Sequence, residues 1–222
     1  MTTVFLKEKK CYVCGKENRY PLVSLAFDTV GPHDLDGRSS HIRRSSVYLW
    51  IQRCISCGYC TMEITEGNPE VRGIVRSPEY KRQLMDPAFP ETANSFLCHS
   101  MIMQNQDEYA DAGWSAVFAA WICDDNSFAE SAIKCREKAL LLFAKAEELG
   151  QQFADEKAVE KVYITDLFRR CGKFREAASI CDSELEKPHP PHVLDMLYLE
   201  RDLIEKGDTA AHSDSEAEEL EF

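Results

Sequence analysis

The stretch CISCGYC, residues 54–60, holds three cysteines in seven positions, and this spacing decides how the N-terminal part of the chain folds. Its first five residues repeat the pattern Cys-x-x-Cys-Gly of an earlier stretch, CYVCG, at residues 11–15. Two intervening residues allow one tight turn to present two sulfurs to the same ion, and Zn²⁺ prefers four thiolates arranged as a tetrahedron. The glycine suits a turn that needs positive φ. The two motifs therefore predict one structural zinc ion per chain, held by Cys11, Cys14, Cys54 and Cys57.

The third cysteine of the stretch, Cys60, forms a second Cys-x-x-Cys pair with Cys57. A thioredoxin-type redox pair has this spacing, but it also needs a βαβ context and a helix that starts after the first cysteine. The sequence shows neither, so we expect Cys60 to pack into a small core. A redox or ligand role for Cys60 stays open at this point.

Composition favours an aqueous, reducing environment. The 222 residues include 10 cysteines. The N-terminus lacks the apolar core of a signal peptide, and no later run reaches the roughly 18 apolar residues that a membrane span needs. We therefore expect a cytoplasmic protein without membrane contact, in which clustered cysteines favour metal binding over disulfides. The scattered cysteines are expected to act as small buried hydrophobic residues: Cys98, Cys123, Cys135, Cys171 and Cys181.

Charge argues against general affinity for nucleic acid, because the formal net charge is −12 and phosphate binding requires clustered positive charge. One local exception is a basic stretch before the second knuckle, interleaved with His41, Tyr48 and Trp50. Its cations could pair with phosphates while the rings stack on bases, although the aromatic residues could equally pack a core. The possible nucleic-acid contacts are Arg38, Arg43, Arg44 and Arg53.

The chain divides by composition into four parts and predicts an α+β fold. Residues 1–67 contain both knuckles and the run SSVYLWIQ (45–52), which favours strands, and so predict a β-rich zinc ribbon. Residues 68–90 form a connector with one short helix, capped by Ser77 and ending near Met85. Residues 91–206 predict an all-helical domain, and residues 207–222 an acidic, disordered tail.

Within the helical domain, the breaks fall at Gly150, Gly172 and KPHPP (187–191). The sequence Ser127-Phe-Ala-Glu130 has the form of a capping box. The segments DEYADA (107–112) and GKFREA (172–177) share an aromatic residue followed three positions later by alanine, as in the second helix of tetratricopeptide repeats, and NSFAES (126–131) is a weaker copy. These features predict TPR-like helical hairpins, with helices over 91–105, 108–124, 127 onward, 156–171, 174–187 and 191–206.

Taken together, the knuckles, the Asp34-Leu35…Arg38 stretch and the Gly172-x-Phe174-x-x-Ala177 turn resemble a bacterial domain family of unknown function. In that family, split rubredoxin-type zinc knuckles precede TPR-like helices, and the resemblance covers most of residues 8–190. Tyr12 and Ile55 stand where such knuckles often have proline. The resemblance implies an architecture and a bacterial cytosolic setting, but no reaction.

The sequence favours a binding role over catalysis. It contains no phosphate-binding Gly-rich loop, no His-Glu-x-x-His motif and no nucleophile elbow. Stacked helical hairpins typically offer surfaces to peptides or proteins. We therefore expect a non-enzymatic zinc-binding adaptor whose helical domain binds a protein or peptide partner. A nucleic-acid-binding zinc ribbon is the alternative, and a thiol redox protein is a weaker one.

Overall fold

A computed structural model describes residues 3–24 and 31–218. The chain forms two compact units, each assembled from two segments: the first unit from 1–28 and 45–145, the second from 29–44 and 146–222. The fold class is α+β, as the sequence predicts. These unit boundaries differ from the domain boundaries expected near residues 67 and 90. The two knuckles share a unit with several helices, and the segment 29–44 belongs to the second unit.

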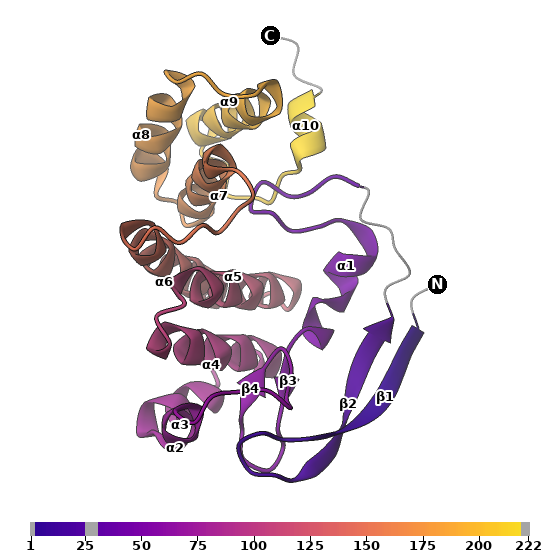
Figure 1. Ribbon diagram of the computed structural model, residues 1–222. Coiled ribbons are helices and arrows are strands. Elements are labelled where there is room, and N and C mark those ends of the chain that lie inside the picture. The colour runs from indigo at the N-terminus through magenta and orange to yellow at the C-terminus, as the bar shows by residue number, and fades with distance from the viewer. Residues whose placement is uncertain (1–2, 25–30, 219–222) are drawn as a thin grey trace. The chain divides into compact units, whose positions relative to one another are not determined.

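Two antiparallel hairpins carry the Cys-x-x-Cys-Gly motifs of the first unit (Figure 1). In the longer one, β1 (Thr3–Lys10) pairs with β2 (Glu17–Ser24), ending in register at Lys10 opposite Glu17. In the shorter one, β3 (Gln52–Arg53) pairs with β4 (Cys60–Thr61). Each motif thus forms the turn that joins two strands of one hairpin.

The run at 45–52 is helical over most of its length, so the strand predicted there is wrong except at its last residue. It contains the end of α1 (His41–Ser46) and a 3₁₀ turn, η1 (Val47–Leu49), before β3 begins. The adjacent residues Ser46 and Val47 are both buried, which does not fit the alternation of a strand with one buried face. Packing against helices has outweighed the β propensity of the individual residues.

The remaining helices of the first unit are α2 (Val71–Arg76), α3 (Pro78–Leu84), α4 (Glu91–Asn105), α5 (Tyr109–Asp125) and most of α6 (Ala129–Glu148). The sequence predicts α3 with its cap, since the Ser77 side chain accepts a hydrogen bond from the backbone N–H of Tyr80 at 3.2 Å. It misses α2, whose six residues include Gly73.

Aromatic side chains pack the first unit around Phe118 on α5. Its ring lies 5.3 Å from that of Trp50 and 5.5 Å from that of Phe96, both nearly edge to face, and it stacks on Trp114. Gly113 makes room for this arrangement, because a Cβ there would come within 2.5 Å of the Phe143 ring. Trp50 is therefore a packing residue.

One turn geometry recurs between consecutive helices. Asp107, Ser127 and Gly172 all have positive φ, and in each case the next residue donates a backbone hydrogen bond to the carbonyl five positions before it. This is the Schellman arrangement. A buried alanine follows five residues after each of the three positions: Ala112, Ala132 and Ala177. Ser127 therefore ends one helix, and the capping-box role predicted for it is wrong.

The second unit contains α7 (Lys157–Arg170), α8 (Phe174–Leu185), α9 (Pro191–Lys206) and the short α10 (Asp214–Glu218). Its core includes Val162, Cys181 and Leu197, together with Leu35 from the segment 29–44. The boundaries of α7, α8 and α9 agree with the predicted helices to within two residues, because glycine and proline mark their ends. The sequence does not predict α10, which lies in the segment expected to be disordered.

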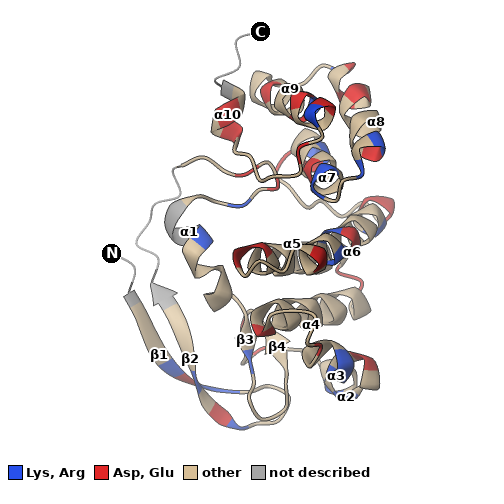
Figure 2. Ribbon diagram, turned by 180° about the vertical axis from the view of Figure 1, so that it is seen from behind, with Lys and Arg blue, Asp and Glu red and all other residues tan. Residues whose placement is uncertain are grey.

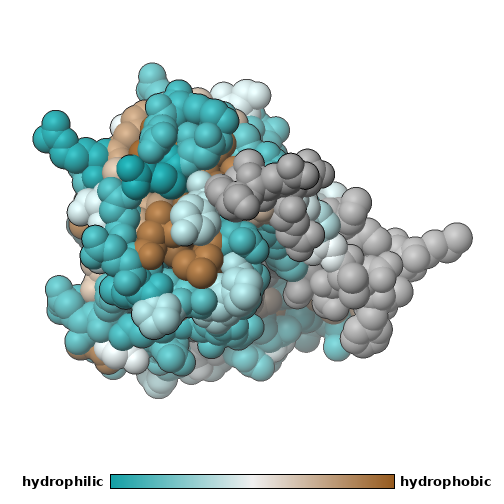
Figure 3. All heavy atoms as spheres, turned by 90° about the horizontal axis from the view of Figure 1, so that it is seen from above, coloured by the Kyte–Doolittle hydropathy of each residue, from teal (hydrophilic) through white to brown (hydrophobic). Residues whose placement is uncertain are grey.

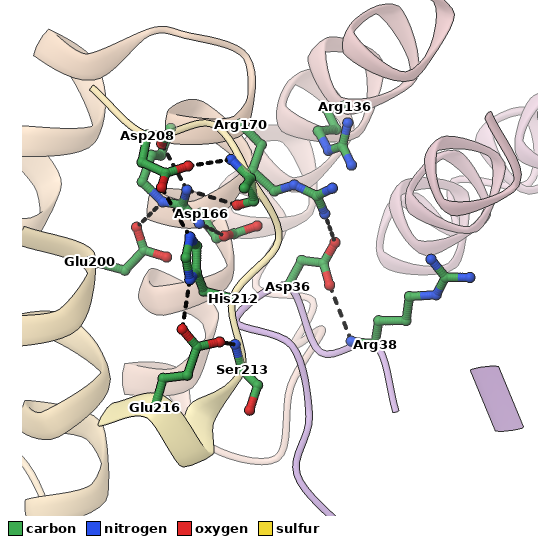
Figure 4. A network of polar contacts seen from close by, with 12 residues as sticks. Asp36, Arg38, Arg136, Asp166, Arg170, Glu200, Asp208, His212, Ser213 and Glu216 are labelled. Atoms are coloured by element: carbon green, nitrogen blue, oxygen red, sulfur yellow. Dashed lines mark hydrogen bonds and ion pairs between the residues drawn. The ribbon is translucent and has the colours of Figure 1, made fainter. Parts of the chain in front are cut away.

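The segment after Gly207, for which the sequence predicts disorder, has defined contacts up to residue 218. The N–H of Leu35 donates to the carbonyl of His212 at 2.8 Å, and the N–H of Asp214 donates to that of His33 at 2.8 Å. The side chain of His212 contacts the carboxylates of Asp208 and Glu216 (Figure 4). These hydrogen bonds replace the apolar burial that the acidic composition lacks.

Buried charges hold this part of the second unit together. The fully buried Arg169 contacts Glu200 at 2.8 Å and Asp166 at 2.5 Å, and also donates to the backbone carbonyls of Asp208 and Ala210. Figure 4 also shows Asp36 between Arg170, at 2.8 Å, and the backbone N–H of Arg38. Side chains from α7, α9 and the segment 29–44, together with backbone groups of residues 38, 208 and 210, therefore contribute to the polar contacts of Figure 4.

No helix in the described residues is long and apolar enough to cross a membrane. The face seen in Figure 3 is mainly hydrophilic, with hydrophobic side chains near its centre.

Candidate metal centre

The four predicted cysteines converge in the first unit. Sγ of Cys11 lies 3.7 Å from Sγ of Cys57, and Sγ of Cys14 lies 3.6 Å from Sγ of Cys54. All four sulfurs lie within 4.8 Å of one another, so that together they could hold one metal ion. A Zn–S bond of about 2.3 Å places tetrahedral sulfurs about 3.8 Å apart, and the two closest pairs have nearly this separation.

The two knuckles have the same backbone geometry. Gly15 and Gly58 both have positive φ, at 71° and 81°, and each donates its N–H to the carbonyl of the first cysteine of its motif at 2.8 Å. The N–H of Cys11 bonds to the carbonyl of Lys16, and that of Cys54 bonds to Tyr59 in the same way. The glycine in each motif is therefore required by the turn itself.

Residues outside the motifs fix the knuckles in place. Tyr80 of α3 is fully buried, donates its hydroxyl to the carbonyl of Gly58 at 3.0 Å and accepts the N–H of Cys60 at 3.0 Å. Lys9 of β1 pairs with Glu63, which follows β4, at 2.5 Å. The sequence gives little sign of either role, because a tyrosine on a short helix and a lysine on a strand are common.

Backbone amides also affect the acidity of the sulfurs. Burial by itself would raise the pKa of Cys54, but the N–H groups of Cys57 and Ser56 lower it to about 7. Burial raises the pKa of Cys57 and, to a smaller extent, that of Cys11. The cluster therefore favours a thiolate at Cys54, which is the form that a metal ligand requires.

A groove of about 680 Å³ lies beside the first knuckle and is lined by Lys10, Arg72 and Arg76 as well as by Cys14. The guanidinium of Arg72 lies over the Tyr12 ring, 5.7 Å from its centroid. No carboxylate lines this groove among the described residues. Four thiolates and Zn²⁺ carry a net charge of about −2, so these cations could offset the charge of the occupied site.

Cys60 does not belong to the cluster. It is fully buried, and its Sγ contacts the carbonyl of Gly58 at 3.3 Å. The metal-ligand group found among the described residues contains the four knuckle cysteines without it. The scattered Cys98, Cys123, Cys135 and Cys181 are also buried, as predicted, whereas Cys171 is partly exposed.

Of the four arginines predicted as nucleic-acid contacts, three have described side chains, and each of these is buried or paired with a carboxylate. Arg38 is 2 % exposed, so the prediction for it is corrected. Arg44 pairs with Asp34 at 2.6 Å, and Arg53 pairs with Glu91 at 3.0 Å. The side chain of Arg43 lies outside the described residues. The basic stretch thus serves mainly in ion pairs, which sequence spacing cannot reveal.

The chain was compared with known protein families, with curated proteins and with solved structures, and none matched.

Proposed function

We propose that this chain is a non-enzymatic, zinc-binding interaction protein. Its Cys11, Cys14, Cys54 and Cys57 hold one structural Zn²⁺, and its TPR-like helical hairpins bind a protein or peptide partner. The observation that carries the proposal is the convergence of four sulfurs without a histidine, aspartate or glutamate in the same group of described residues. A site closed by four thiolates leaves no position for a substrate or a reactive water.

The helical part of the proposal rests on the repeated turn at Asp107, Ser127 and Gly172 and on the buried alanine that follows each. Small residues at these positions let consecutive helices pack closely, which is how helical repeats build binding surfaces. The adaptor function is inferred from this helical pattern, and the rubredoxin-like character of the knuckles is inferred from their Cys-x-x-Cys-Gly motifs. Nucleic-acid binding is the alternative, but Arg38, Arg44 and Arg53 lend it little support.

Metal content tests the first part of the proposal. We expect one zinc per chain in wild type and in Cys60→Ser, and loss of zinc in Cys57→Ser, because three sulfurs cannot close the tetrahedron. Substitution with Co²⁺ should give the absorption of a tetrahedral thiolate complex in the same two proteins. Zinc retained by Cys57→Ser but lost by Cys60→Ser would reject this ligand assignment.

Affinity capture tests the second part, with wild type and Cys57→Ser as baits in lysates with and without nuclease treatment. A protein recovered at stoichiometric amounts after nuclease would support the adaptor role. Nucleic acid that is recovered instead, and is lost at moderate salt, would favour the alternative because phosphate contacts weaken steeply with salt.

A further inference from the structure

A second cavity in the first unit has the properties of a binding pocket. It measures about 330 Å³ and lies along α4 and α5, with Met62 from the segment after β4 at its side. This volume is at the lower end of the range of about 300–1,000 Å³ that is typical of ligand pockets. It suits one side chain or a similarly small group, but not a nucleotide cofactor.

The wall of this cavity is aromatic and flexible. Trp114 and Phe118 stack with their centroids 5.8 Å apart and an interplanar angle of 27°, and both are only partly buried. Met62 and Met103, which are also partly buried, complete the apolar wall. Aromatic faces attract cations through the ring quadrupole, and methionine adapts its shape to different occupants.

The polar floor of the cavity offers acceptors. The Ser115 hydroxyl donates its one hydrogen to the backbone carbonyl of Asp111 at 2.8 Å, so it must accept from Nδ1 of His99, also at 2.8 Å. His99 is 6 % exposed, and burial lowers its pKa to about 4, which keeps the ring neutral. Nε2 is then an acceptor, and no described residue donates to it.

The charge around the cavity is negative. The exposed residue Asp111 stands at its edge, and no lysine or arginine is among the described residues that line it. Helices α4 and α5 carry no Lys or Arg at all, as the colouring of Figure 2 shows. An anionic group would therefore meet a carboxylate and a bare nitrogen lone pair, whereas a cationic donor would find partners for both its charge and its hydrogens.

We propose that this cavity binds the cationic end of an arginine or lysine side chain in a basic segment of a partner protein. The stacked rings of Trp114 and Phe118 would contact the cation, Nε2 of His99 would accept its hydrogen bond, and Asp111 would offset its charge. The net charge of −12 would also attract a basic partner before contact. This inference rests on the proposed interaction function and specifies the chemistry of the partner.

The test is an NMR titration of the zinc-bound full chain with the acetylated and amidated pentapeptide Gly-Gly-Arg-Gly-Gly. The imidazole ¹⁵N signal of His99 and the indole signal of Trp114 are followed, after assignment with His99→Gln and Trp114→Phe. We expect both signals to shift with the arginine peptide, and much less with the citrulline peptide, which has the same shape but no charge. Equal shifts with citrulline or glutamate in place of arginine would overturn the proposal.

Two variants of the chain complete the test. Asp111→Asn should weaken binding of the arginine peptide about fivefold, as expected for the loss of one partly screened ion pair. Glu108→Gln removes an exposed charge near the pocket that does not line it, and should leave affinity unchanged. An unchanged affinity in Asp111→Asn would contradict the inference.

Agmatine, a free guanidinium compound, distinguishes a cavity that binds a side chain of a partner protein from one that binds a small free cation. If it binds as tightly as the pentapeptide, the cavity takes a free cation and the assignment to a partner protein fails. Weaker binding of agmatine supports the assignment. Because these probes are defined compounds, failure here is distinguishable from failure of the proposed function, which would be seen in the zinc content and the capture experiment.

Discussion

In the first unit four cysteine sulfurs converge between two short hairpins, whereas in the second unit the guanidinium of Arg169 is enclosed by Asp166 and Glu200. Both arrangements join segments that are distant in sequence. The first could hold a metal ion taken from solution, while the ion pairs of the second lie within the chain. The stability of the first unit should therefore depend on metal supply, and that of the second on its internal ion pairs.

Arg169→Met should lower the free energy of unfolding more than any other substitution considered for the two units. It leaves the carboxylates of Asp166 and Glu200 buried without their cation, and breaking a buried ion pair from one side costs about 3–5 kcal/mol. Urea unfolding, with hydrogen exchange in α9 as the local readout, would measure this loss. Arg201→Met, whose exposed partners are Asp182 and Glu205, is the control and should cost less than about 1 kcal/mol. Equal losses in the two variants would show that burial does not set the cost.

Lowering the pH should destabilise the first unit and stabilise the second. The change in the free energy of unfolding should be slightly smaller than that caused by Arg169→Met. His99 has a pKa of about 4 in the folded first unit and near 6.5 in the unfolded chain, so unfolding takes up a proton at intermediate pH. Its contribution is complete above about pH 6.5 and falls by about 3 kcal/mol as the pH drops to about 4. Hydrogen exchange in α4 between pH 7 and 4 would measure this slope, which His99→Gln should flatten.

In the second unit, burial next to Asp166 raises the pKa of Glu200 well above its usual value, despite the charge of Arg169. The folded state therefore binds this proton more tightly than the unfolded chain does. The contribution of Glu200 is complete below its unfolded pKa and is lost as the pH rises through its folded pKa. Exchange in α9 should show this trend in wild type but not in Glu200→Gln. If protection against exchange changed with pH in the same direction in α4 and α9, the predicted opposite behaviour of the two units would be contradicted.

Gly58→Ala in the second knuckle should destabilise the protein less than Arg169→Met does. An alanine at φ 81° costs about 1–2 kcal/mol, and its Cβ would also lie 2.4 Å from Cδ2 of Leu84, which must move. We expect weaker zinc binding in competition with a chelator. Gly73→Ala is a matched control in α2, where a Cβ meets nothing within 4 Å, and it should stabilise by about 0.5–1 kcal/mol. Indistinguishable zinc affinities would remove the role assigned to the Gly58 conformation.

The smallest effect concerns the cations beside the first knuckle. Replacing both Arg72 and Arg76 by Gln should weaken zinc binding about two- to fivefold at low salt, since exposed charges interact weakly through water. The difference should shrink as salt is added. Lys81→Gln, an exposed charge on α3 outside the groove, is the control. Unchanged affinity at low salt would mean that these cations do not offset the charge of the metal site.

The comparison also explains which features the sequence reveals. Metal ligands have a local spacing that few other functions need, so Cys11, Cys14, Cys54 and Cys57 can be recognised in pairs. Helix ends at Gly150, Gly172 and the prolines are similarly local. The ion network of Arg169 instead uses common residues from α7, α9 and the chain after Gly207, and no spacing relates them.

The other differences between the sequence-based predictions and the structure also arise from contacts between residues that are distant in sequence. Leu35 enters the core of the second unit, and its N–H bonds to a carbonyl more than 170 residues later, so neither the discontinuous units nor the ordered segment after Gly207 could be expected from composition. Ser127 looks like a helix cap, but the Schellman turn places it at positive φ. Long-range packing decides these positions, and pairwise motifs do not encode it.

Hydrogen exchange before and after removal of zinc by a chelator is the most direct test of the central claim. If one zinc ion organises the knuckles while the second unit relies on its own ion pairs, protection should be lost in β1, β2 and residues 52–61 and retained in α7 and α9. Retained protection throughout the knuckles, or its loss in α7 and α9, would contradict this account.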